Sequence, residues 1–140
     1  MKVLKNVKLY GELTDISVEN GKIAAIGKTD IDGTDFGGNE IYPGLIDTHS
    51  HGCIGLDASD KDVDLARMAD YELENGVSTW YPTTATADAE ILKSVTSMNL
   101  DVGHGANMSG FHMEGPFINI NYKGGQNAEF VQSISADFFN

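Results

Sequence analysis

The stretch YPGLIDTHSHG, residues 42–52, places two histidines one residue apart at the end of an apolar run. A short apolar run bounded by Pro43 and Gly52 is typical of a buried strand. Side chains two residues apart in a strand point to the same face, so His49 and His51 aim at one point. Neutral imidazole is a good ligand for zinc and similar divalent metals. The pair therefore indicates a metal site, against the alternative of two polar residues that merely lead from a strand into a turn.

The chain from residue 43 onward alternates between strand-like and helix-like segments. Strands are expected over 44–50, 77–83 and 105–114, and helices over 60–76 and 87–100. The first helix is indicated by Leu65, Met68 and Leu73 at helical spacing, with an acidic first turn and a glycine after its end. Residues 134–140 read as the start of another helix. Such alternation predicts a parallel sheet whose functional residues gather at the carboxyl ends of the strands.

Residues 1–42 follow a different pattern, of short strands separated by turns. The expected strands cover 2–10, 13–19, 22–27 and 38–43. Asn20-Gly21 between two of them is a strong hairpin signal. We therefore expect a small, largely antiparallel β domain over 1–42, part of a sandwich, followed by a second domain over 43–140.

The composition limits the classes of function. The net charge is −12, from 21 acidic and 9 basic residues, which argues against binding to nucleic acid or to anionic membranes. Cys53 is the only cysteine, so an intrachain disulfide is impossible. Neither a signal-peptide core nor a run of about 18 apolar residues is present. A cytoplasmic protein with no membrane partner is the expectation.

The third expected strand also ends in potential metal ligands. His112 and Glu114 are two residues apart and are followed at once by Gly115 and Pro116. A carboxylate at this edge would face the same point as the histidine pair, and its two oxygens could bridge two metals. Glu114 is therefore the expected third ligand, with a solvated loop residue as the alternative. For His112, orientation of a ligand and simple packing remain equally open.

These residues resemble a known group of enzymes. PGLIDTHSHG is similar to the first barrel strand of the amidohydrolase superfamily, metal-dependent hydrolases on a TIM-like barrel. GFHMEGPFININYKGGQ, residues 110–126, is similar to the segment of N-acetylglucosamine-6-phosphate deacetylases that carries their metal-binding glutamate, and ENGVSTWYPTT matches their second strand. The resemblance covers essentially the whole chain. It implies an α/β fold: a small β-sandwich-type sheet, then the first three strands and two helices of a TIM-like barrel, which is incomplete because a closed barrel needs about 250 residues.

The resemblance also implies roles for individual residues. Glu114 matches the metal ligand shared across the deacetylases, and His49 and His51 match a pair that holds a second metal in some members. Gln126 and Asn119 are the substrate-binding candidates, although a turn explains Asn119 as well and other members show histidine at the position of Gln126. The implied cofactor is a divalent metal, with zinc first and manganese, iron or cobalt close behind. The implied substrate is an amino sugar phosphate.

The resemblance further implies catalytic groups that this sequence lacks. The family takes two more histidines and a catalytic aspartate from later strands, and these are expected beyond residue 140. We therefore expect the N-terminal portion of a deacetylase that converts N-acetylglucosamine 6-phosphate to glucosamine 6-phosphate and acetate, inactive by itself. Three barrel strands leave an exposed edge and an uncovered apolar face, so we expect a homo-oligomer.

Two alternative functions remain open. Another amidohydrolase, such as a cyclic-amide hydrolase or a nucleobase deaminase, would share the His-x-His strand but not the HMEGPF segment. A short non-catalytic module for metal binding or subunit interaction is favoured by the absence of the later ligands.

Overall fold

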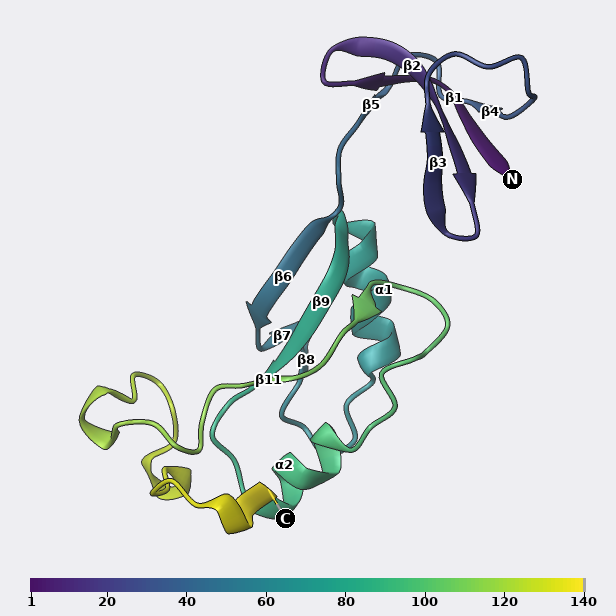
Figure 1. Cartoon of the computed structure of the whole chain (residues 1–140). Helices are drawn as coiled ribbons and strands as arrows, with labels where there is room; N and C mark the ends of the chain where they lie inside the picture. Colours follow the sequence, from purple (N-terminus) through teal and green to yellow (C-terminus); the bar gives the residue numbers. More distant parts are fainter. Residues whose placement is uncertain (140) are drawn as a thin grey trace. The chain divides into compact units, whose positions relative to one another are not determined.

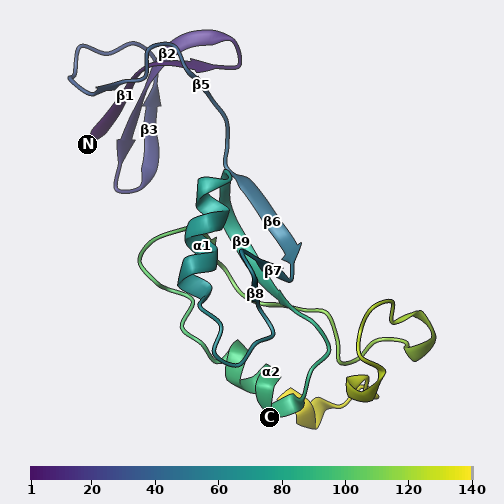
Figure 2. The ribbon, with the colours of Figure 1, turned by 180° about the vertical axis from the view of Figure 1, so that it is seen from behind.

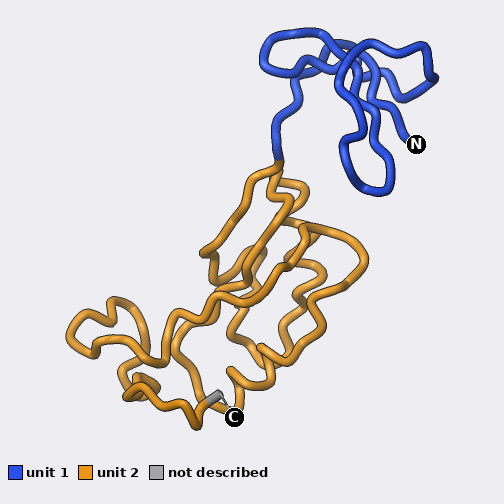
Figure 3. Tube along the Cα trace, in the orientation of Figure 1, with its two compact units in different colours: residues 1–43 blue, residues 44–140 orange. Residues whose placement is uncertain are grey.

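The computed structural model describes residues 1–139 and divides the chain into two compact units. The first is Met1–Pro43, and the second begins at Gly44 (Figure 3). Each unit has its own sheet, and the candidate metal ligands all lie in the second.

The first unit is a five-stranded sheet with the order β3-β2-β1-β4, in which β5 also pairs with β1 (Figure 1). Its strands are β1 (Lys2–Leu9), β2 (Glu12–Glu19), β3 (Lys22–Ile26), β4 (Thr34–Asp35) and β5 (Glu40–Ile41). The first three pair antiparallel, and Asn20 and Gly21 form the predicted turn with φ of 52° and 73°. The two short strands pair parallel to β1, so the sheet is mixed rather than purely antiparallel.

Asp15 is a buried carboxylate at the centre of the first unit, with 1% of its surface exposed. It accepts hydrogen bonds from the backbone N–H of Asn6 (2.8 Å) and of Thr29 (3.0 Å), and Lys28 Nζ lies 3.2 Å from it. Asn6 sits at φ 52° in a bulge of β1, which turns its N–H toward the carboxylate. The Asn6 hydrogen bond contributes most, and with Thr29 and Lys28 it outweighs burial and holds the pKa of Asp15 well below its usual range.

We predict that Asp15→Asn destabilises the first unit, because the new NH2 group meets N–H donors that need an acceptor. A carboxylate with a lowered folded-state pKa stabilises the fold above its unfolded pKa, and this contribution is lost as the pH falls from about 4 through the folded pKa. The variant should have a Tm several degrees lower at pH 7, and its Tm should fall less than that of the unchanged chain when the pH is lowered. Thermal unfolding at several pH values measures both. Asp32→Asn, an exposed change in the same unit, is the control and should leave both unchanged.

The second unit is built on a parallel sheet with β9 (Val77–Thr84) at its centre. β6 (Leu45–Ser50) pairs with one edge of β9, and β10 (Asn107–Met108) and β11 (His112–Met113) pair with the other, all parallel. A small hairpin of β7 (Gly52–Cys53) and β8 (Leu56–Asp57) follows β6. Because the strands are parallel, the carboxyl ends of β6, β9 and β11 all lie at the same end of the sheet, which we call its carboxyl edge.

Two helices accompany this sheet. Helix α1 (Leu65–Glu74) covers one face of it (Figure 2) and buries Met68 in the cluster that contains Trp80. Helix α2 (Ala89–Thr96) follows β9. Asp64 and Asp88 cap the two helices by accepting hydrogen bonds from backbone N–H groups of their first turns. No helix in the described part of the chain is long and apolar enough to cross a membrane.

The second unit also differs from the sequence-based expectation in several places, and both helices are shorter than the expected 60–76 and 87–100. The strand expected over 105–114 is split into β10 and β11, because Gly110 between them has φ 158°, outside strand geometry. The acidic residues expected in the first turn of α1 precede it instead, and only Asp64 acts, as the cap. The helix expected over 134–140 is a 3-10 turn, η3 (Ala136–Phe139), after η1 (Ile120–Tyr122) and η2 (Ala128–Phe130), and Asn140 lies outside the described residues.

Candidate metal centre

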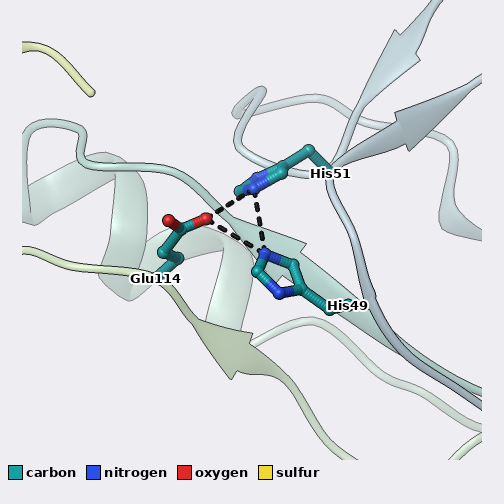
Figure 4. A group of neighbouring side chains, drawn as sticks. All are labelled: His49, His51 and Glu114. Carbon is teal, nitrogen blue, oxygen red and sulfur yellow. Dashed lines mark hydrogen bonds and ion pairs between the residues drawn. The ribbon is translucent and has the colours of Figure 1, made fainter. Parts of the chain in front are cut away.

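Three potential metal ligands meet at the carboxyl edge of the parallel sheet. His49 lies near the end of β6, His51 follows that strand directly, and Glu114 follows β11 directly (Figure 4). The two Nε2 atoms of the histidines lie 3.3 Å apart, and Glu114 Oε2 lies 3.1 Å from that of His49 and 2.7 Å from that of His51. The structure thus brings together all three residues that the sequence singled out as ligands.

Local backbone contacts explain why the side chains converge. On the β6 side, the backbone N–H of His49 donates to the Asp47 carboxylate at 2.8 Å, and a register irregularity relative to β9 falls between Asp47 and Ser50. Gly52 then allows a tight return of the chain, since a Cβ at this position would approach Leu56 O to 2.2 Å. On the other side, the Glu114 N–H donates to Thr84 O at 3.0 Å and so extends the β11–β9 pairing by one residue.

The electrostatic balance keeps Glu114 ionised. Burial raises its pKa, but hydrogen bonds from His49, His51 and Gln126 outweigh burial, and the pKa of Glu114 lies below its usual range. The three side chains remain between 35% and 50% exposed, so the site is open on one side. The three atoms that face one point all carry lone pairs. A divalent cation placed between them is therefore a better partner for each than the other two atoms are.

A cavity of about 590 Å³ adjoins this site. Its lining includes His51 and Glu114 together with the loop residues Tyr122, Lys123 and Gln126. Asn119 lines a different cavity, and its side chain accepts a hydrogen bond from the Asn121 N–H at the start of η1. The structure thus places Gln126 beside the candidate ligands, whereas Asn119 lies apart and has a local role in a turn.

His112 lies next to the site without joining the three ligands. Its ring meets that of His49 edge-on, with the ring centres 4.6 Å apart, and its Nδ1 lies 3.4 Å from Thr83 Oγ1. Both histidines line a second hollow, with Ile46 and Phe111. His112 is therefore in a position to steady the ring of His49.

Two other residues that could have bound a metal are not among the three. His104 is exposed and pairs with Asp70, with 2.6 Å between His104 Nδ1 and Asp70 Oδ1. Cys53 is half-buried, and burial, followed by the charge of Glu72, raises the pKa of its thiol, which keeps it in its poorly ligating protonated form.

Sequence reasoning missed the part that Thr86 plays in this region. Thr86 lies just beyond β9, is 6% exposed and lines the cavity. Its backbone N–H donates to Gln126 Oε1 at 2.6 Å, and its hydroxyl donates to Asn127 O at 3.3 Å. The one sequence signal for Thr86 was its position just after a strand of the sheet, where site residues gather. A threonine shortly before a helix is equally typical of a helix cap, so this signal did not decide its role.

Comparisons with known proteins give a consistent result, although no protein-family model matches the chain. An N-acetylgalactosamine-6-phosphate deacetylase of Escherichia coli O157:H7 is 32% identical over 85% of this chain and 33% of its own length. The N-acetylglucosamine-6-phosphate deacetylases of Homo sapiens and Danio rerio are 35% and 32% identical, over 75% and 96% of this chain and over 27% and 36% of their own lengths.

Solved structures support the same relationship at the level of the fold. The N-acetylglucosamine-6-phosphate deacetylase of Thermotoga maritima matches 98% of this chain and 38% of its own, with a TM-score of 0.78 and 23% identity. A variant of the Mycobacterium smegmatis enzyme, in complex with N-acetyl-D-glucosamine-6-phosphate, matches 99% of this chain and 39% of its own, with a TM-score of 0.79 and 21% identity. The predicted resemblance is confirmed: over most of its length this chain is related to the N-acetylglucosamine-6-phosphate deacetylases, and it spans about a third of the length of these curated relatives.

Proposed function

We propose that this chain supplies the His49–His51–Glu114 part of a metal-dependent site that hydrolyses the N-acetyl group of N-acetylglucosamine 6-phosphate, giving glucosamine 6-phosphate and acetate. The observation that carries the proposal is the meeting of these three ligands at one edge of a parallel sheet, in a chain related to such deacetylases. A cyclic-amide hydrolase or a nucleobase deaminase finds no comparable support among these relatives.

The three donor groups fit a divalent metal. Two ligands on a tetrahedral zinc ion lie roughly 3.3 Å apart, given zinc–nitrogen distances of about 2.0–2.1 Å. The separation of 3.3 Å between the histidine Nε2 atoms agrees with this value, and small side-chain movements would bring the Glu114 oxygen to the same spacing. Imidazole and carboxylate together suit zinc best, and manganese, iron and cobalt nearly as well.

The residues of this chain would divide the work at such a site. A bound divalent metal supplies Lewis acidity toward the amide carbonyl and lowers the pKa of water. His49 and His51 would hold it through Nε2 and Glu114 through its carboxylate. Lys123 places a positive charge at the cavity wall, which favours an anionic sugar phosphate in a chain with a net charge of −12.

The rest of the proposal concerns groups that these residues do not supply. The family resemblance also implies a catalytic aspartate and further histidines. We assign these roles to none of residues 1–140. The parallel strands β6, β9 and β11 would belong to a TIM-like barrel. Within the described residues β6 pairs only with β9, and Leu45 and Ile46 on it are 63% and 65% exposed, which supports self-association along this edge.

N-acetylgalactosamine 6-phosphate is the second candidate substrate. It is favoured by the relative from Escherichia coli O157:H7, whose name specifies that sugar and which covers 85% of this chain. The two sugars differ only in the configuration of one ring hydroxyl, so the metal site would serve both in the same way.

We predict that His49→Ala and Glu114→Ala each weaken Zn²⁺ binding by more than about 100-fold, beyond the range usual for residues that only support a ligand. Isothermal titration of the purified chain with Zn²⁺ measures the effect. The control is His104→Ala, which removes an exposed histidine outside the site and should bind as the unchanged chain does. Unchanged affinity in both site variants would refute the metal centre.

We predict that the zinc-loaded chain binds N-acetylglucosamine 6-phosphate more tightly than glucosamine 6-phosphate, because only the former has an amide carbonyl to present to the metal. Titration followed by NMR should show shifts at Lys123 and Gly124, which line the cavity. A parallel titration with N-acetylgalactosamine 6-phosphate decides between the two sugars. Equal binding of the acetylated and free amino sugars would contradict the proposal.

We predict that the 140-residue chain with stoichiometric zinc releases no acetate from either sugar above the rate without protein, because it holds three ligands and no assigned proton-transfer group. An assay for free acetate measures this. Sustained turnover would show that a residue of this chain performs the proton transfer.

A further inference from the structure

The side chain of Gln126 is anchored on Thr86 and lies in the cavity wall that also contains Glu114. Its Oε1 accepts the backbone N–H of Thr86 at 2.6 Å, a short bond to a residue that is 6% exposed. A backbone N–H can only donate, so this bond fixes which end of the amide is the oxygen. The NH2 group must then face the opposite way, and Gln126 lines the same cavity as Glu114, where its amide helps to hold the pKa of that carboxyl below the usual range.

The surrounding backbone ties the same elements together. The Thr86 hydroxyl donates to Asn127 O at 3.3 Å, next to Gln126 in the chain. Gly115, next to Glu114, lies so close to Thr86 that a Cβ there would come within 2.4 Å of Thr86 Cγ2. The loop that carries Gln126 and the turn that carries Glu114 are therefore both fastened to the segment just after β9.

We propose that Gln126 is a positioning residue, which orients the Glu114 carboxylate toward His49 and His51 rather than contacting substrate. A glutamate side chain has several rotatable bonds, and ordering it costs conformational entropy at the moment a metal binds. An amide anchored on Thr86 N–H removes part of that cost in advance. Outer partners of this kind usually change metal affinity by about 10–100-fold.

This inference rests on the proposed metal site and adds to it the residue that sets the orientation of one ligand. It replaces the substrate contact expected for Gln126 with a role exerted through Glu114. The two roles differ in what they affect: a substrate contact leaves metal affinity unchanged, whereas a positioning role changes it only while Glu114 is present.

A double-mutant cycle on the whole chain tests the proposal, with Co²⁺ as the probe and its visible absorption as the signal. Gln126→Met keeps the side-chain length and removes the amide group, with its hydrogen bond to Thr86. We expect it to raise the Co²⁺ dissociation constant by about 10–100-fold in the otherwise unchanged chain. In a Glu114→Gln background, where no carboxylate remains to be oriented, the same change should have no effect.

Gln132→Met is the matched control, because Gln132 is exposed and its hydrogen bond to Pro116 O uses only its backbone N–H. It should bind Co²⁺ as the unchanged chain does. Equal weakening by Gln126→Met in both backgrounds would mean general damage to the loop and would overturn the proposal. Unchanged affinity would also overturn it and leave the metal site standing, whereas failure of the unmutated chain to bind Co²⁺ would remove both.

A second measurement needs no variant and remains decisive if Gln126→Met does not fold. In NMR spectra of the unmutated chain, the Gln126 side-chain amide protons should show cross-relaxation with the Glu114 side chain, and the Thr86 backbone amide should exchange slowly with solvent. Absence of the contact to Glu114, in a spectrum where both residues are assigned, would overturn the proposal.

Discussion

The parallel pairing of β9 with β6 on one side and β11 on the other is the constraint on which the candidate site depends. Ser50 lies opposite Pro82, and Met113 lies opposite Thr84, so the strands end at nearly the same level along β9. His51 and Glu114 are 63 residues apart in sequence, yet this register brings them to 2.7 Å. A shift of β11 by one residue would turn the glutamate to the other face of the sheet.

Around this edge, the chain supports the ligands mainly through backbone groups. The His49 and Glu114 N–H groups are both bonded, and the Thr86 N–H holds the amide of Gln126. Backbone partners cannot change rotamer, so they fix direction more firmly than a second layer of long side chains would. Of the candidate ligands, His49 thus lies on a strand and His51 directly after it, whereas Glu114 lies in the turn after β11.

Some of these features can be predicted from short sequence patterns, and others depend on contacts between distant residues that no such pattern reveals. A period of two in the strand is enough to place His49 and His51 on one face, and the same period indicates Glu114. The break at Gly110 depends on backbone dihedrals that no alternation of residues reveals, and so the third strand was expected to be continuous. The contact of Gln126 with Thr86 joins residues 40 apart and depends on the path of a loop, which propensity does not determine. The buried Asp15 was missed for a similar reason, since its partners are backbone groups on a bulge and a loop.

Trp80 provides a fluorescence signal from the second unit. It is the only tryptophan of the chain, it is fully buried, and its indole N–H donates to Ser50 Oγ at 2.7 Å. Ser50 stands between the two candidate histidine ligands, so the chromophore is coupled to the strand that carries them. Indole emission depends on the polarity and hydrogen bonding around the ring, and the tryptophan emission of this chain, excited apart from that of the tyrosines, therefore reports on the second unit alone. Ordering or loosening of the ligand-bearing strand becomes visible without any added label.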